Sequence, residues 1–162
     1  MCSFIISQNN NIPRIKKIIR SLSERAGERI AGTDEFSFPT ADVVEALGEK
    51  ELFDLKTGFR AKYIYDAAKK VNGGDVDLLS IPRMPTFKGA DALCDIKGIG
   101  PKVAACALLF GFGKYDAFPV DVWIKKAIEK YFPGEFDATR LGPYAGVAQQ
   151  YLFYYERYLG GE

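Results

Sequence analysis

The sequence of 162 residues contains no histidine. Histidine is the usual general base near neutral pH, and it belongs to serine and cysteine catalytic triads and to the HExxH zinc motif. Its absence excludes all of these sites. Any acid–base or nucleophilic chemistry must be carried by lysine, aspartate, glutamate, tyrosine or cysteine side chains.

Cysteine is also scarce. Cys2, Cys94 and Cys106 lie far apart in the chain and form no CxxC pair. This pattern argues against a cysteine-ligated zinc or iron–sulfur site. An odd number of scattered cysteines fits a reducing cytoplasm better than a disulfide framework.

Long apolar runs and a strong net charge are missing as well. No run reaches the ~18 residues of a membrane span, and the net charge is only +1. With 48% hydrophobic residues, the chain is long enough for one compact domain with a real core. Basic residues nevertheless cluster, and each cluster is either a solvated helix face or a track for phosphates. These clusters are Arg14, Lys16, Lys17 and Arg20; Arg60 and Lys62; and Lys125, Lys126 and Lys130.

Apolar periodicity and the placement of glycine and proline predict an almost entirely helical chain. Pro13 opens the first long helix, and Gly27 ends it. The residues that follow predict helices over 41–47, 49–55, 60–71, 75–79, 86–93, 122–131 and 144–159, and one from Pro101 that ends near Gly111 and buries Phe110. We expect an all-α fold in two lobes with a cleft between them.

A glycine-rich hairpin separates two of these helices. Gly98 and Gly100 are able to take positive φ, and Pro101 falls in a first helical turn, where its missing N–H costs nothing. The free N–H groups of such a turn, together with the helix dipole, favour an anion such as a phosphate. An ordinary αα-hairpin is the alternative interpretation.

Two chemically capable residues accompany the hairpin. Lys102 opens its second helix, and Asp121 follows nineteen residues later. Burial and a helix N-terminus both lower a lysine pKa, which would make Lys102 a nucleophile; otherwise it is a phosphate contact or a surface charge. Asp121 is a helix N-cap, and a carboxylate held by that cap can also stabilise a cationic sugar. A phosphate-binding hairpin, an amine and a carboxylate together suggest chemistry on DNA.

The segment from Leu93 to Ala104, followed by Val120-Asp121-Val122, resembles the helix-hairpin-helix DNA glycosylase superfamily. Three more blocks narrow the resemblance to the 8-oxoguanine DNA glycosylase family, and it then covers essentially the whole chain. These blocks are Cys2 to Arg14, Gly58 to Tyr63, and Gly142 to Gln149. The resemblance implies one glycosylase domain over residues 1–162, with its hairpin motif at about residues 87–110.

The resemblance assigns catalytic roles to both residues. Lys102 matches the lysine that attacks C1′ of the damaged nucleotide and holds the sugar as a Schiff base, which permits strand scission by β-elimination. Asp121 matches the aspartate that supports the oxocarbenium-like transition state. Gln149, Phe153 and Cys106 match the residues that read and sandwich the flipped base.

Further residues correspond to the family's DNA contacts. Asn9, Arg14 and Arg60 match those that contact the estranged cytosine, and Phe59 matches the aromatic wedge. The hairpin backbone of Gly98, Gly100 and Val103 would bind the DNA backbone. The carbonyls of Cys94, Ile96 and Ile99 match those that hold a structural cation, monovalent or divalent, and no other cofactor is implied.

The sequence departs from the family in three places. Trp123 stands where eukaryotic members have a phosphate-binding histidine, and Phe59 stands for a tyrosine. Members usually carry a β-rich domain before the segment that begins at Met1, and we expect this chain to lack it. A backbone carbonyl that senses the N7 proton of 8-oxoguanine lies in that domain.

The resemblance thus predicts a bifunctional DNA N-glycosylase and abasic-site lyase that removes 8-oxoguanine opposite cytosine. Two alternatives remain: a glycosylase for another damaged purine, and a truncated, non-catalytic DNA-binding module. The partner is damaged double-stranded DNA, with no membrane, and a monomer is expected. We expect a cytoplasmic, nucleoid-associated protein in a bacterium and a nuclear one in a eukaryote.

Overall fold

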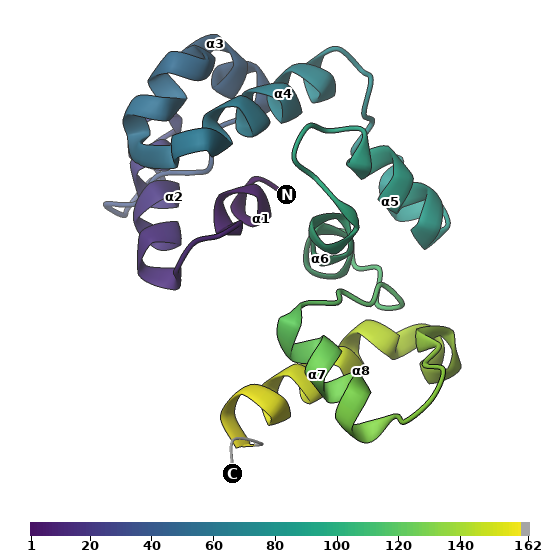
Figure 1. Ribbon diagram of the computed structural model, residues 1–162. Helices are drawn as coiled ribbons and strands as arrows, with labels where there is room; N and C mark the ends of the chain where they lie inside the picture. Colours follow the sequence, from purple (N-terminus) through teal and green to yellow (C-terminus); the bar gives the residue numbers. More distant parts are fainter. Residues whose placement is uncertain (160–162) are drawn as a thin grey trace. The chain divides into compact units, whose positions relative to one another are not determined.

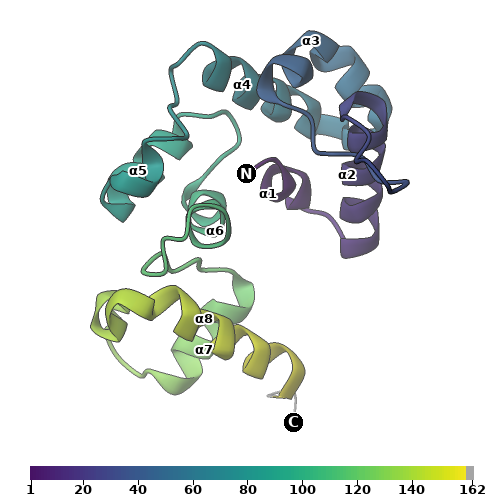
Figure 2. The same cartoon turned by 180° about the vertical axis from the view of Figure 1, so that it is seen from behind.

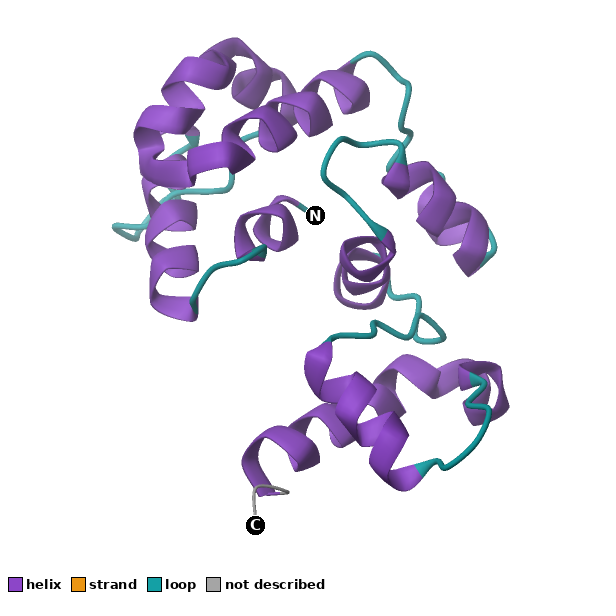
Figure 3. Ribbon diagram, viewed as in Figure 1, coloured by secondary structure: helices purple, strands orange, loops and turns teal. Residues whose placement is uncertain are grey.

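The computed structural model describes residues 1–159 and is built almost wholly from helices there (Figure 3). Those residues contain no β-strand beyond an isolated antiparallel bridge between Arg29 and Phe36. The predicted all-α class is confirmed. The chain divides into two compact units: unit 1 contains residues 1–79 and 92–99, and unit 2 contains residues 80–91 and those from Gly100 onward. The predicted cleft stays a prediction.

Unit 1 is a cluster of four α-helices with two short turns of helix after the third (Figure 1). Asn11 caps the second of these helices by accepting the Arg14 N–H at 3.0 Å, and Gly27 ends it as predicted. The helices are α1 (Cys2–Ser7), α2 (Ile12–Ala26), α3 (Ala41–Leu52) and α4 (Ala61–Asn72), with the π-helical η1 (Phe53–Thr57) and the 3₁₀ turn η2 (Gly58–Arg60) before α4.

The core of unit 1 is aliphatic. Burial of one such side chain contributes about 1.5–3 kcal/mol, so α1, α2 and α4 are held by their apolar faces rather than by helix propensity alone. The fully or almost fully buried members include Ile5, Ile6, Ile18, Leu22, Leu52 and Ile64. Gly48 has φ 73° and kinks α3 where the sequence predicted a break between two helices.

Unit 2 places three longer helices around a core of alanine, leucine and isoleucine. Helices α7 and α8 lie side by side in both views (Figures 1 and 2). Gly146 permits a close approach at the start of α8, since a Cβ there would lie 2.2 Å from the Ala117 carbonyl oxygen. The elements are η3 (Ile81–Arg83), α6 (Pro101–Gly111), α7 (Val122–Tyr131), η4 (Ala138–Tyr144), α8 (Ala145–Tyr154) and the π-helical η5 (Tyr155–Leu159); α5 (Thr86–Cys94) begins in unit 2 and ends in unit 1.

Two predicted elements are wrong in detail. Residues 75–79 form turns rather than a helix, and the Asp77 carboxylate accepts the Leu79 N–H at 2.9 Å, a local turn that competes with helix formation. The last helix changes to π-helical geometry after Tyr154.

Among residues 1–159, no helix combines the length and the apolar character needed to cross a membrane.

Candidate active site

A cavity of about 180 Å³ in unit 2 brings together five of the residues singled out from the sequence. They come from one face of α6, from the loop before α7 and from α8. The lining consists of Lys102, Cys106, Phe110, Pro119, Asp121, Gln149, Gln150 and Phe153. The five are Lys102, Asp121, Gln149, Phe153 and Cys106, which lie up to about fifty residues apart in the chain.

Helix α6 contributes three residues spaced by four positions, Lys102, Cys106 and Phe110. Such spacing places side chains on one face of a helix. Lys102 lies in the first turn, after Gly100 as N-cap and Pro101, and no side chain caps this end. The amide groups of Lys102 and Val103 therefore lie at an uncapped, electropositive helix end.

One alternative for this helix is decided and one expectation is wrong. Lys102, for which the sequence left burial or exposure open, is exposed in the first turn of α6. Phe110 is 56% exposed and lines the cavity instead of the core. Its position eight residues after Lys102 could have predicted this placement, since the two share a helix face.

Asp121 is the N-cap of α7, as predicted. Its Oδ1 accepts the backbone N–H groups of Trp123 at 3.0 Å and Ile124 at 2.9 Å. Oδ2 receives no hydrogen bond from residues 1–159. The two bonds hold the carboxylate in one orientation in the lining of the cavity.

The charges of Lys102 and Asp121 both act on the thiol of Cys106. Burial raises the pKa of its thiol above the ordinary value, and the ammonium of Lys102, which is hydrogen-bonded to the thiol, opposes that rise. The carboxylate of Asp121 adds to the rise in the pKa. The thiol at the wall of the cavity therefore stays neutral near pH 7, and it contacts the cavity as a small, weakly polar group.

Helix α8 supplies a buried amide and an aromatic ring. Gln149 is only 3% exposed, and its Oε1 accepts a hydrogen bond from Nε2 of Gln150. A buried amide needs hydrogen-bond partners, and a ligand in the cavity could supply them for Gln149. Phe153 is half-buried, with the guanidinium carbon of Arg157 5.5 Å from its ring centre.

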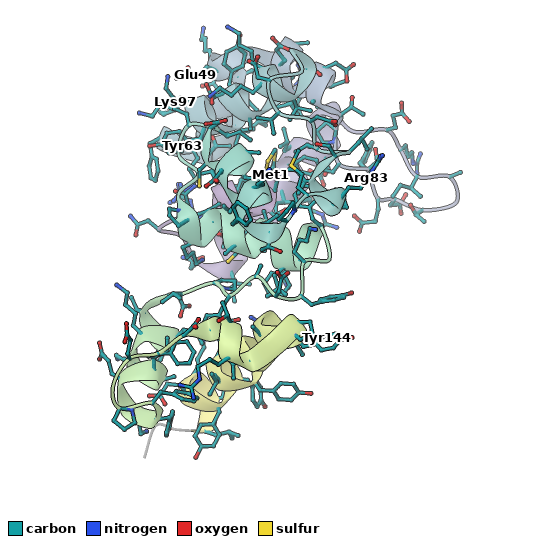
Figure 4. All side chains as sticks on the ribbon, turned by 90° about the vertical axis from the view of Figure 1, so that its right-hand side faces the viewer. Met1, Glu49, Tyr63, Arg83, Lys97 and Tyr144 are labelled. Atoms are coloured by element: carbon teal, nitrogen blue, oxygen red, sulfur yellow. The ribbon has the colours of Figure 1, made fainter. Side chains whose placement is uncertain are left out.

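The hairpin turn between α5 and α6 is held from unit 1 by one face of α4. Gly98 has φ 79°, and a Cβ there would lie 2.4 Å from the Tyr63 ring. Tyr63 and the neighbouring Lys97 are both labelled in Figure 4. The Asp66 carboxylate accepts the Lys97 N–H at 2.7 Å and lies 3.4 Å from Lys70 Nζ, which donates in turn to the Asp95 carbonyl.

Gly100 differs from the expectation that it takes positive φ. Its φ is −99°, an ordinary extended value, and a Cβ on it would meet nothing within 4 Å. The conformation of this residue therefore does not require glycine. The absence of a side chain instead leaves the backbone open at the end of α6.

The carbonyls predicted to hold a cation belong to the same turn. The Ile96 carbonyl accepts the Ile99 N–H at 3.0 Å, and a carbonyl oxygen has a second lone pair. Within residues 1–159, no group of three or more cysteine, aspartate or glutamate side chains could hold a metal ion. A cation at this turn would therefore depend on the backbone oxygens of Cys94, Ile96 and Ile99, which are ligands of the kind that hard cations prefer.

Arg60 is 3% exposed in unit 1, contrary to the usual surface position of arginine. Its guanidinium donates to the carbonyls of Gln8, of Asn9 at 2.8 Å and of Thr57 at 3.1 Å. Burial, and then the nearby charge of Arg14, lower its pKa from the ordinary value. In this arrangement Arg60 holds the turn at Asn9, which has a left-handed φ of 46°.

The other three predicted contacts of this group are exposed. Asn9 is exposed, and Arg14 is exposed and donates to the Lys56 carbonyl at 3.4 Å. The ring of Phe59 is 48% exposed and lies 4.4 Å from the guanidinium carbon of Arg60. An exposed aromatic ring beside the guanidinium of Arg60 is available for contact with a ligand.

Residues 2–140 match the family described as HhH-GPD superfamily base excision DNA repair protein. The chain belongs to the HhH-GPD superfamily of base excision DNA repair proteins. It is also 33% identical to N-glycosylase/DNA lyase OGG1 of Arabidopsis thaliana and 30% identical to a probable N-glycosylase/DNA lyase of Methanothermobacter thermautotrophicus. These alignments cover 99% and 98% of this chain but only 46% and 60% of the two relatives.

A solved protein structure is also similar to this chain in fold and in sequence. The Clostridium acetobutylicum 8-oxoguanine glycosylase/lyase, bound to double-stranded DNA with cytosine opposite 8-oxoguanine, superposes with a TM-score of 0.83. It is 39% identical, and the match covers 96% of this chain and 57% of that one. The predicted resemblance is confirmed, and the chain spans about half the length of the curated relatives it matches.

Three residues of the cavity, and one residue of α4 that contacts the hairpin turn, were not predicted as site residues: Phe110, Pro119, Gln150 and Asp66. Gln150 follows a residue that was predicted, but nothing in the sequence shows that both amides reach the cavity. The Asp66 carboxylate accepts a hydrogen bond from the N–H of Lys97, thirty-one residues later in the chain. Such a contact leaves no local signal in the sequence.

Proposed function

We propose that this chain is a bifunctional glycosylase and abasic-site lyase that removes 8-oxoguanine opposite cytosine from duplex DNA. The observation that carries the proposal is the single cavity lined by Lys102, Asp121, Cys106, Gln149 and Phe153. A primary amine and an oriented carboxylate share that cavity with a buried amide and an aromatic ring. The substrate follows the named activity of the Clostridium acetobutylicum relative.

Lys102 supplies the nucleophile. Once its ammonium group has given up a proton, Nζ attacks C1′ as the N-glycosidic bond breaks, and the purine leaves with the bonding electrons and takes up a proton. Loss of the sugar ring oxygen as a hydroxyl then gives a Schiff base between Nζ and C1′. That iminium acidifies C2′, so removal of a C2′ proton expels the 3′-phosphate by β-elimination.

Asp121 stabilises positive charge that develops on the sugar. Its carboxylate is already oriented by the two N–H groups of α7, so it needs little reorganisation in the transition state. Gln149 reads the edge of the flipped base, while Phe153 and the neutral thiol of Cys106 contact its faces. The cavity of about 180 Å³ is smaller than typical drug-sized pockets, which suits one base rather than a whole nucleotide.

The remaining predicted roles are part of the proposal. The open backbone of Gly98, Gly100 and Val103 binds DNA phosphate, and the carbonyls of the turn hold the structural cation. In unit 1, Phe59 acts as the wedge, while Asn9 and Arg14 contact the estranged cytosine. Arg60 must exchange part of its bonds to Gln8 and Asn9 for a direct contact with that base.

Borohydride trapping tests the proposal. The chain is incubated with duplex DNA that bears one 8-oxoguanine opposite cytosine, then reduced. We expect a covalent adduct with the wild-type protein and none with Lys102→Gln. Lys125→Gln is the matched control, because it removes an exposed lysine that does not line the cavity.

Other outcomes discriminate between the alternatives. An adduct with a duplex that contains another damaged purine, but none with 8-oxoguanine, would indicate a related glycosylase with a different substrate. Duplex binding without an adduct on any substrate would leave a non-catalytic DNA-binding module.

A further inference from the structure

The C-terminal helical segment has an exposed aromatic face that the proposed chemistry does not use. Tyr151, Tyr154, Tyr155 and Tyr158 recur along α8 and η5, and we call these four residues the tyrosine face. They are 76%, 58%, 49% and 59% exposed, respectively. Large apolar rings grouped in this way on a surface indicate a binding site more often than scattered single residues do.

None of the four tyrosines lines the cavity, although Gln149, Gln150 and Phe153 of the same helix do. The four rings therefore do not help to form the base pocket. They also do not form the core of unit 2, because each is about half exposed or more.

The rings pack in two pairs, and a cation lies beside each pair. The Tyr154 and Tyr158 ring centres are 5.1 Å apart, and the Arg157 guanidinium carbon lies 5.2 Å from the Tyr158 ring centre. In the second pair, Tyr155 packs edge-on against Tyr131, over whose ring Lys130 Nζ lies at 4.9 Å. Aromatic rings flanked by cations are the combination found where proteins bind single-stranded nucleic acid.

The nearest carboxylate does not oppose a polyanion. Glu156 has a side chain only 10% exposed, and it accepts a hydrogen bond from the Tyr131 hydroxyl at 3.1 Å. Lys130 Nζ lies 3.7 Å from the same carboxylate. A hydrogen bond with Tyr131 is the largest cause of the raised pKa of Lys130, and the negative charge of Glu156 adds to it. Lys130 shares its charge with Glu156, so the exposed positive charge beside the rings is mainly that of Arg157.

We propose that the tyrosine face binds single-stranded DNA by stacking unpaired bases on its rings, with Arg157 and Lys130 near the phosphates. Each base offers a flat π surface, so this binding is tolerant of sequence. It needs neither base damage nor the lysine chemistry of the cavity. The proposal therefore stands apart from the proposed glycosylase activity.

Fluorescence anisotropy with a labelled, undamaged oligothymidylate of about 12 nucleotides tests this. We expect binding that salt weakens, and a loss of roughly tenfold or more in affinity for Tyr154→Leu combined with Tyr158→Leu. Leucine keeps an apolar side chain but removes the ring. Tyr154→Phe with Tyr158→Phe keeps both rings and should bind like the wild type.

Tyr144→Leu is the matched control, because this residue is 63% exposed and stacks on Tyr115 outside the tyrosine face (Figure 4). It should leave the affinity unchanged. Circular dichroism checks folding, and the single variant Tyr158→Leu decides the matter if the double variant does not fold.

Three results would overturn the proposal. The first is no binding of the strand at low salt. The second is equal affinity for the leucine and phenylalanine variants. The third is a wild-type dimer in sedimentation that Tyr158→Leu dissociates, which would assign the face to a second copy of the chain.

Discussion

At the scale of single residues, Asp121 combines a structural and a proposed chemical role in one carboxylate. Its Oδ1 caps α7 through two backbone bonds, and it lines the cavity with Lys102. Helix caps are common and need no chemistry to explain them. The two roles can be separated because the cap needs only an oxygen acceptor, whereas charge stabilisation needs an anion.

We therefore expect Asp121→Asn to keep the stability of the fold and to lose base excision, while Asp121→Ala also loses about 0.5–2 kcal/mol of the free energy of unfolding. Urea denaturation and single-turnover excision measure the two effects. Excision by Asp121→Asn at the wild-type rate would leave the residue as a cap alone.

Burial of the Cys106 thiol gives a second prediction, on pH. Its pKa is raised above the ordinary value of 9.0, so the folded state binds the proton more tightly than the unfolded chain does. The free energy of unfolding should therefore fall as pH rises above about 9, where the unfolded thiol ionises. Urea unfolding between about pH 8 and 10 should show a smaller decrease for Cys106→Ala. An unchanged slope would assign the decrease to other groups, such as Cys2, whose pKa is also raised by burial.

At the scale of elements, helices α4 and α6 perform different tasks. Helix α6 places Lys102, Cys106 and Phe110 on one face, so a single helix presents three residues to the cavity. Helix α4 uses Tyr63, Asp66 and Lys70, spaced by three and four residues, to hold the hairpin turn of unit 1. The turn therefore depends on a helix that contributes no residue to the cavity.

This arrangement predicts the behaviour of variants in the turn. Gly98→Ala should lose roughly 2–5 kcal/mol of stability, because alanine at φ 79° is strained and its Cβ would overlap Tyr63. Gly100→Ala is the control and should change stability by less than about 1 kcal/mol. Asp66→Ala should weaken duplex binding, while the excision rate at saturating duplex stays close to that of the wild type.

Asp66→Asn retains an oxygen that can accept the Lys97 N–H, so it should rescue most of the binding lost in Asp66→Ala. Binding titrations and single-turnover rates measure the two parameters separately. If Asp66→Ala lowered the saturated rate and left the affinity unchanged, the hairpin would not be the part that Asp66 positions.

At the scale of the whole molecule, a net charge of +1 gives no general attraction to DNA. Duplex binding must then come from local groups such as Arg14 and the open amides of the hairpin. We expect affinity to fall with salt with a slope that corresponds to a few phosphates, about 0.9 for each one neutralised. Lys97→Ala changes an exposed residue of the hairpin, and a slope reduced by about 0.9 would count it as a phosphate contact. An affinity independent of salt would contradict phosphate binding by the chain.

The sequence predicted where most helices begin better than it predicted the short helix over 75–79 or the surroundings of individual side chains. Proline near the first turn of α2 and α6 and the Asp121 cap of α7 placed the starts of these helices correctly, because such signals act within one turn. The helix over 75–79 was wrong because an aspartate stabilised a turn there instead. Phe110 was assigned to the core because its apolar character does not reveal whether a helix face meets protein or a cavity.

The sequence by itself determined the helical class, the caps and the list of residue types that can perform chemistry. Local backbone preferences and the absence of histidine are sufficient for these conclusions. Only the tertiary structure decided that Lys102, Asp121 and Gln149 share one cavity, that Arg60 is buried on backbone carbonyls, and that Asp66 holds the hairpin. These contacts join residues that are distant in the chain, so packing rather than local sequence brings them together.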